Sequence, residues 1–156
     1  MKHSLGHEIQ QTKPFGSLEQ MAFLNLQRTA ALLNRDMAGI LKRAGLTPGA
    51  FNVLHILKGA GPEGRTCGEI FERLVSPVPD VTRLLDRVTA KGWASRRRAT
   101  SDRRVVRTLI TEAGLRLLEE IDPQVQEAHR RQLSHLTREQ LEMLNALLEE
   151  ARRPFT

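Results

Sequence analysis

Residues 79–110 read PDVTRLLDRVTAKGWASRRRATSDRRVVRTLI, and this stretch decides the fold. Its first part places apolar side chains at helical spacing, at Val81, Leu84, Leu85 and Val88. Its second part holds two short runs with strand-forming residues on either side of the turn ATSD. The stretch therefore predicts a helix that begins at Pro79 and is closed by Gly92, followed by a β-hairpin with RRRATSDRR at and beside its tip.

A shorter helix is predicted just before this one. Thr66 and Glu69 have the spacing of a capping box and open the segment TCGEIFERL, which the turn VSPV separates from Pro79. The outward positions of the second helix are Thr82, Arg83, Asp86, Arg87 and Lys91. Two short helices joined by a tight turn, the second apolar behind and basic in front, match a helix-turn-helix. With a basic hairpin directly after it, the pattern is that of a winged helix.

Longer helices are predicted on both sides of this lobe. Their starts are marked by Ser17 with Gln20, by Thr47-Pro48, by Thr111-Glu112 before a helix that contains Pro123, and by Thr137 with Gln140. The predicted fold is mainly α with a small β-hairpin wing, in a single domain over residues 1–156. Residues 1–16 form a flexible arm, 47–111 the winged helix-turn-helix lobe, and 17–45 and 112–153 the N- and C-terminal helices of a dimerisation region.

The dimerisation region is inferred from apolar surface. The first long helix carries apolar residues on more than one stripe, and the last helix is lined by Leu141, Leu144, Leu147 and Leu148. This is more than a small lobe could bury, and an exposed patch of that size is normally an interface. The alternative is that these helices pack against each other within one chain.

Composition sets the broad class. The chain has 156 residues, the length of one domain, and a single cysteine, Cys67, which excludes an internal disulfide and fits a reducing compartment. No stretch is apolar enough to span a membrane, and the N-terminus lacks the apolar core of a signal peptide. We therefore expect a cytoplasmic protein with no membrane partner.

The positive charge is confined to one part of the chain. Residues 75–107 hold nine Lys or Arg against three acids, a surplus of +6 that equals the net charge of the whole chain. Charge spread for solubility would not be confined in this way, whereas a surface that binds a polyanion would be. The alternative is an exposed basic turn without a partner.

The helix and the hairpin suit duplex DNA. Arg83 and Arg87 lie four residues apart on one helical face and can enter the major groove, with Thr82 near the helix start and Lys91 near its end. The alternative for these arginines is surface charge paired with nearby acids. Within the hairpin, we expect Arg96, Arg97, Arg98 and Arg103 to neutralise phosphates. We expect Asp102 to brace Arg104 through a charge-assisted hydrogen bond, so that the arginine is ready to enter the minor groove.

These motifs resemble the MarR family, the multiple-antibiotic-resistance-type transcriptional regulators. The resemblance rests on VTRLLDRVTAKGW, then RRRATSDRRVVRTLITEAGLRLL, and is strongest over residues 66–118. It implies a homodimer with intertwined N- and C-terminal helices that binds a palindromic operator, usually as a repressor, and in many members a small ligand, often an aromatic acid, releases the DNA. By position, Arg83 matches the recognition-helix arginine, and Asp102 and Arg104 match an Asp-x-Arg pair of the wing. The turn SPVPD is one residue longer than the commonest form.

Other reactive residues are not assigned to sites. Cys67 is expected to be a small packed residue rather than a redox sensor. His55 is expected to be a packed core histidine, with a place in a ligand cleft as the alternative. His129 and His135 lack metal-ligand spacing, and we expect no metal, no cofactor and no catalytic residue.

The predicted function is a dimeric, sequence-specific DNA-binding transcriptional regulator and not an enzyme. The alternative is a helical protein–protein adaptor that keeps the fold without binding an operator.

Overall fold

The computed structural model describes residues 4–99, 102 and 104–155. The order of the elements is α1 (Leu5–Glu8), α2 (Leu18–Arg43), α3 (Pro48–Ala60), the 3₁₀ turn η1 (Gly61–Glu63), α4 (Cys67–Phe71), α5 (Val81–Ala90), β1 (Ala94–Arg98), β2 (Val106–Ile110), α6 (Glu112–Leu133), α7 (Arg138–Arg152) and the 3₁₀ turn η2 (Arg153–Phe155). This mainly helical chain with one two-stranded antiparallel hairpin confirms the predicted fold class.

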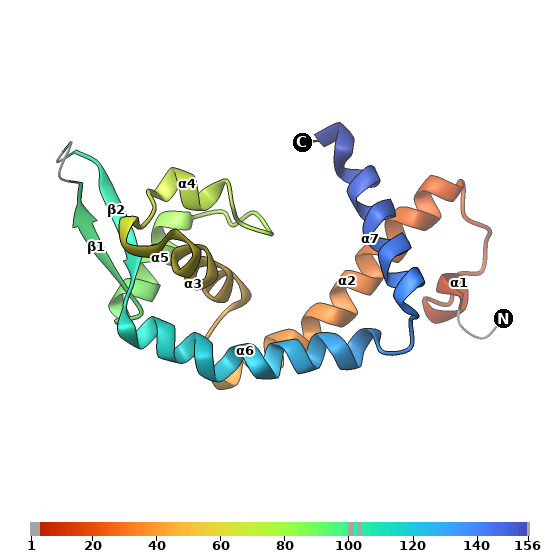
Figure 1. Ribbon diagram of the computed structural model, residues 1–156. Coiled ribbons are helices and arrows are strands. Elements are labelled where there is room, and N and C mark those ends of the chain that lie inside the picture. The colour runs from red at the N-terminus through yellow and green to blue at the C-terminus, as the bar shows by residue number, and fades with distance from the viewer. Residues whose placement is uncertain (1–3, 100–101, 103, 156) are drawn as a thin grey trace.

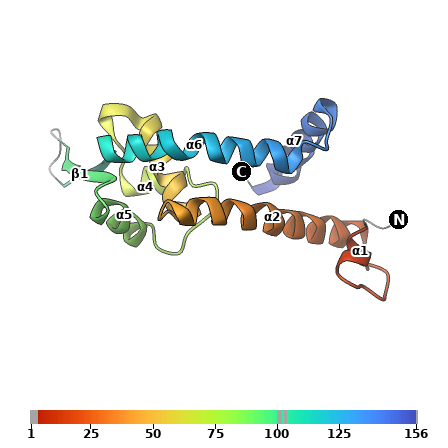
Figure 2. The same cartoon turned by 90° about the horizontal axis from the view of Figure 1, so that it is seen from below.

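The molecule is elongated. The hairpin and helices α3, α4 and α5 form a lobe at one end, and α1 and α7 lie toward the other (Figure 1). Two long helices, α2 and α6, connect the two ends and run beside each other when seen from below (Figure 2). The two helices are tied by Gln132, whose amide donates to the carbonyl of Leu33 at 3.0 Å.

Polar side chains start the helices where the sequence predicts. The side chains of Thr66 and Thr137 each accept a hydrogen bond from the backbone N–H three residues later. The side chains of Glu69 and Gln140 accept from the backbone N–H of the two threonines in turn, so both capping boxes are complete. The box at Ser17 is incomplete, because the Gln20 side chain accepts from the N–H of Gly16 at 2.7 Å.

The start of α5 differs from the prediction. Asp80 caps the helix by accepting from the N–H of Arg83 at 2.8 Å, and the first helical residue is Val81. Placing Pro79 as the first helical residue was therefore wrong, because the aspartate one residue later satisfies the free N–H groups and sets the boundary. The N-terminal segment also differs, since residues 5–8 of the expected arm form one helical turn with Leu5 buried.

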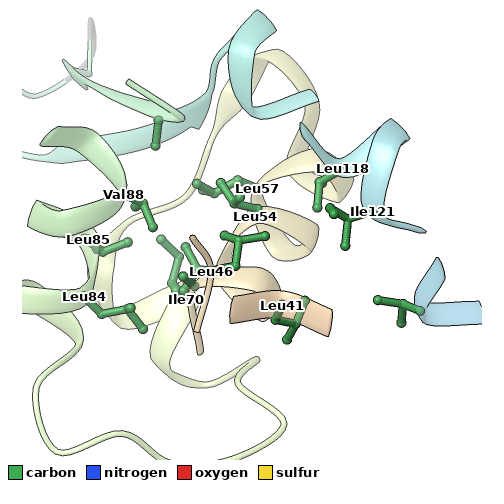
Figure 3. Close-up of a cluster of buried hydrophobic side chains, with 14 of the residues drawn as sticks. Leu41, Leu46, Leu54, Leu57, Ile70, Leu84, Leu85, Val88, Leu118 and Ile121 are labelled. Atoms are coloured by element: carbon green, nitrogen blue, oxygen red, sulfur yellow. The ribbon is translucent and has the colours of Figure 1, made fainter. Parts of the chain in front are cut away.

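The core lies inside the lobe and fixes α5. Leu54 and Leu57 of α3 are fully buried and lie among side chains from α2, α4, α5 and α6 (Figure 3). From α5, the inward residues are Val81, Leu84, Leu85 and Val88, as predicted, and all four are buried. Because one face of α5 is held in this way, its opposite face must point to solvent.

The hairpin is anchored at its base by close backbone contacts. Arg65 and Thr108 exchange backbone hydrogen bonds of 2.9 and 2.7 Å, which adds a short bridge beside β2. Gly64 lies so close that a β-carbon there would be 2.5 Å from the carbonyl oxygen of Thr108, and its φ of +62° also favours glycine. Gly114, in the first turn of α6, has no room for a β-carbon against the carbonyl of Trp93.

The long helices are largely exposed in the single chain. Only Ile40 and Leu41 of α2 are buried, and α7 has no buried residue. Among the described residues, no helix combines the length and the apolar character needed to cross a membrane.

Candidate nucleic-acid interface

The outward face of α5 is polar and basic, as predicted. Thr82, Arg83, Asp86 and Arg87 are exposed there, and Lys91 follows as the exposed C-cap residue. Lys91 lies above the Trp93 ring, 6.0 Å from its centroid. Arg83 and Arg87 are one helical turn apart, so their side chains can reach the same surface.

The first strand divides its arginines between the two faces of the hairpin. Alternate residues of a strand point to opposite faces, so Ala94, Arg96 and Arg98 share one face and Arg97 lies on the other. Arg96 turns toward α5 and lies 2.7 Å from the carboxylate of Asp86. Arg97 turns the other way and donates to the carbonyl of Pro62 in η1 at 3.0 Å. Both arginines expected to contact phosphate thus have partners inside the lobe.

Arg107 stabilises the base of the hairpin from the same side as Arg97, the residue opposite it in the register. It donates to the carbonyl of Gly64 at 3.2 Å and to Glu69 Oε2 at 3.4 Å, and its side chain is 29% exposed. The pKa of Glu69 lies below its usual value, first because its carboxylate accepts a hydrogen bond from the Thr66 N–H. Partial burial acts in the opposite direction, and the positive charges of Arg107 and Arg65 lower the pKa further. The candidate site residues did not include Arg107. Strand alternation is the signal that places it on the face of Arg97 and away from Arg96 and Arg98.

Asp102 and Arg104 are in contact, with the geometry that the sequence suggested. Asp102 Oδ1 accepts from the backbone N–H of Arg104 at 2.9 Å and from its Nε at 3.3 Å, and Oδ2 accepts from a terminal nitrogen at 3.3 Å. The backbone hydrogen bond, followed by the side-chain one, holds the pKa of Asp102 below its usual value. The side chain of Arg104 remains 91% exposed. Arg103, another candidate, lies outside the described residues.

Three arginines stand apart from these contacts. Over residues 4–99, 102 and 104–155, the side chains of Arg83, Arg87 and Arg98 form no hydrogen bond or ion pair. Arg83 and Arg87 lie on the outward face of α5, and Arg98 lies near the hairpin tip on the same strand face as Arg96. Arg104 is added to them because its side chain remains 91% exposed although it is paired with Asp102. We call these four residues the open arginines.

A hollow lies beside α5. It has a volume of about 380 Å³ and is lined by Gly45, Thr47, Ala50, Leu84, Arg87, Val88, Ala90, Lys91 and Trp93. Its walls are mainly apolar, and its lining includes two cationic side chains, Arg87 and Lys91. Such a combination suits a small apolar molecule with an anionic group.

The remaining candidates have ordinary partners. His55 is half-exposed rather than buried in the core, and its ring contacts Phe51 edge-on. Its Nε2 lies 2.8 Å from Asp122 Oδ1, and Lys58 lies 3.5 Å from the other oxygen of Asp122. Cys67 is exposed, contrary to the expectation of a packed residue, with its sulfur 3.8 Å from the Thr82 hydroxyl. The described residues contain no group of three or more His, Cys, Asp or Glu arranged to hold a metal ion.

A helix-turn-helix followed by a basic hairpin defines the class of winged-helix transcriptional regulators. The model of the MarR family matches residues 44–105. The HTH-type transcriptional repressor MdtR of Bacillus subtilis is 33% identical over 123 residues, 79% of this chain and 77% of that protein. The repressor IacR of Pseudomonas putida is 28% identical over 131 residues, 84% of this chain and 77% of that protein.

Solved structures agree with this assignment. A MarR transcription factor from Planctomyces limnophilus superposes with a TM-score of 0.67 at 38% identity, covering 87% of this chain and 98% of the other. Sco3205 of Streptomyces coelicolor, a MarR family regulator solved in complex with DNA, superposes with a TM-score of 0.82 at 19% identity, covering 94% and 93%. The chain belongs to the MarR family of transcriptional regulators.

Proposed function

We propose that this regulator is a homodimer that binds a palindromic operator, represses transcription and is released by a small ligand in the cytoplasm. The observation that carries the proposal is the set of open arginines. Arg83 and Arg87 would read base edges in the major groove, with Thr82 and Lys91 beside them, while Arg98 would meet phosphate and the Asp102–Arg104 pair would enter the minor groove.

Dimer formation is supported by apolar side chains that the single chain leaves in water. On α2 and α7 these include Leu18, Phe23, Leu26, Leu32, Met143, Leu144 and Leu147. Burying a large apolar side chain contributes about 1.5–3 kcal/mol, so a partner covering this set would gain substantial free energy. Packing within one chain, the alternative considered from the sequence, leaves these side chains exposed. Residues 17–45 and 112–153 would then form the dimerisation region and 47–111 the DNA-binding lobe.

Repression and ligand release rest on similarity and on the hollow beside α5. MdtR and IacR are named as repressors. A structural neighbour, the organohalide-sensing regulator RdhR-CbdbA1625, was solved with 2,4-dichlorophenol bound; it is 19% identical, with a TM-score of 0.81. The hollow of about 380 Å³ beside Arg87 and Lys91 would accept an aromatic acid. His55, paired with Asp122, remains a second candidate ligand residue.

The test is selection of bound fragments from the source genome, followed by affinity measurements over a range of salt. A specific regulator should enrich fragments with inverted repeats about one DNA turn apart and bind them far more tightly than scrambled duplexes. The logarithm of affinity should fall with that of salt, with a slope of about −0.9 per neutralised phosphate. Equal affinity for every duplex, together with a tight protein partner, would instead favour the adaptor.

A further inference from the structure

We propose that Asp86 and Arg96 form a strut that sets the angle between α5 and the hairpin, so that this pair controls sequence discrimination without contacting DNA. The inference rests on the proposed function and concerns how the two DNA-contacting elements are held together. Its central observation is the distance of 2.7 Å between a guanidinium nitrogen of Arg96 and a carboxylate oxygen of Asp86.

Among the described residues, the direct polar contacts between α5 and the hairpin are otherwise confined to the base of the hairpin. At the base, the N–H of Trp93 donates to the carbonyl of Val88 at 3.0 Å, and the N–H of Thr111 donates to the carbonyl of Trp93 at 3.0 Å. From β1 outward, the Asp86–Arg96 pair is the one hydrogen bond or ion pair between α5 and either strand among the described residues. Arg65, Arg97 and Arg107 hold the other side of the hairpin to η1 and α4, and the Asp86–Arg96 pair adds a contact that fixes its distance from α5.

The charges of the two residues fit a strut better than a phosphate contact. Asp86 lies on the outward face of α5, between Arg83 and Arg87 in sequence, where an uncompensated carboxylate would repel phosphate. Arg96 neutralises this carboxylate and forms a pair with no net charge. If Arg96 moved to a phosphate, it would leave an unpaired acid facing the same duplex.

The pair is also expected to contribute little to the stability of the fold. The side chains of Arg96 and Asp86 are 37% and 56% exposed, and exposed ion pairs contribute little to folding free energy. Its effect is therefore expected in the geometry of binding. A small change in the angle between helix and hairpin would separate the groove contacts of Arg83 from those of Arg98 and Arg104.

The experiment compares Asp86→Asn, Arg96→Gln and the double variant by fluorescence anisotropy, using a selected operator fragment and a scrambled duplex. A strut predicts that each single substitution lowers operator affinity on the order of tenfold and that the double variant loses no more than one of them. Asp86→Asn should leave scrambled-duplex affinity unchanged or raised, because an acid has been removed. Thermal midpoints should stay close to that of the wild type. Glu127→Gln, which removes a carboxylate from an exposed ion pair on α6, is the matched control and should not lower operator affinity.

A charge exchange provides the decisive readout. Asp86→Arg and Arg96→Asp should each lose operator affinity, and the two together should recover most of it, since the pair is rebuilt in reverse. Higher operator affinity in Asp86→Asn, or additive losses in the double variant, would overturn the strut and make Arg96 a phosphate contact. A wild type that binds both duplexes equally would refute the proposed function, and the inference with it.

Discussion

Asp102 holds Arg104 in place while leaving its guanidinium almost entirely in solvent. The carboxylate accepts the backbone N–H of Arg104 at 2.9 Å and two side-chain nitrogens at 3.3 Å, yet the arginine side chain is 91% exposed. An exposed pair of this kind contributes little to stability. Its value lies in presenting an oriented cation at the hairpin tip, which reduces the conformational entropy lost when the arginine binds.

Replacing Asp102 by alanine distinguishes an orienting effect of the carboxylate on Arg104 from its electrostatic effect on DNA binding. The variant gains a net positive charge, so electrostatics alone predicts tighter binding to every duplex. If the carboxylate orients Arg104, operator affinity should instead fall several-fold, while scrambled-duplex affinity stays level or rises. Anisotropy titrations with both duplexes distinguish the two. A parallel rise on both would show that Asp102 has no positioning role.

Replacing Arg83 and replacing Arg98 should change the affinities for operator and scrambled DNA in different ways. Arg83→Ala removes a proposed base contact and should cost about 1–3 kcal/mol on the operator with little change on scrambled DNA. Arg98→Ala removes a proposed phosphate contact and should weaken both duplexes alike, reducing the magnitude of the salt slope by about 0.9. Salt titrations of the two variants provide the measurement. If Arg83→Ala left the ratio of the two affinities unchanged, α5 would not be the reading helix.

The apolar surface of α7 predicts a dimer that a charge would break. Leu147 is 60% exposed in the single chain, so Leu147→Glu should cost the isolated chain little. Placed in an apolar interface, the same carboxylate would be desolvated, and sedimentation should show monomers. Asn145→Glu, at another exposed position of α7, is the matched control. An unchanged dimer in Leu147→Glu would place the interface elsewhere.

Two glycines predict opposite effects on stability. Gly114 has no room for a β-carbon beside the carbonyl of Trp93, so Gly114→Ala should destabilise the lobe by about 1–3 kcal/mol. Gly59 lies in α3 with open space around it, so Gly59→Ala should stabilise the chain by about 0.5–1 kcal/mol. Chemical unfolding of both variants gives the comparison. Equal effects would mean that α6 can shift away from Trp93.

Glu69 predicts a pH-dependent contribution to stability. Its pKa in the folded chain lies below the ordinary value of 4.5, so its charged form stabilises the fold above that value. This contribution is lost as the pH falls through the lowered pKa. Glu69→Gln keeps the capping hydrogen bonds but loses the ion pairs with Arg65 and Arg107. The wild type should therefore melt higher than the variant at neutral pH, and the difference should shrink as the pH falls below 4.5 and through the lowered pKa. A difference that persists in acid would assign the effect to packing.

Local patterns in the sequence predicted most of the fold. A 3.6-residue period placed the inward residues of α5, and capping pairs such as Thr66 with Glu69 and Thr137 with Gln140 marked helix starts, because both depend on neighbours within one or two turns. The boundary at Pro79 was wrong because two adjacent residues could each begin the helix, and the capping bond of Asp80 decided between them.

The sequence by itself determined that a basic helix is followed directly by a basic hairpin, but it grouped Arg96 and Arg97 together as phosphate contacts. Only the tertiary structure decided which arginines remain available. Asp86 meets Arg96 because α5 packs beside β1, and Arg107 meets Glu69 across 38 positions of sequence. Periodicity predicts which side chains share a face of a helix or strand. Which other element lies against that face is decided by how the elements pack to bury their common core. Charge in this lobe is therefore local in sequence, while its pairing is decided by packing.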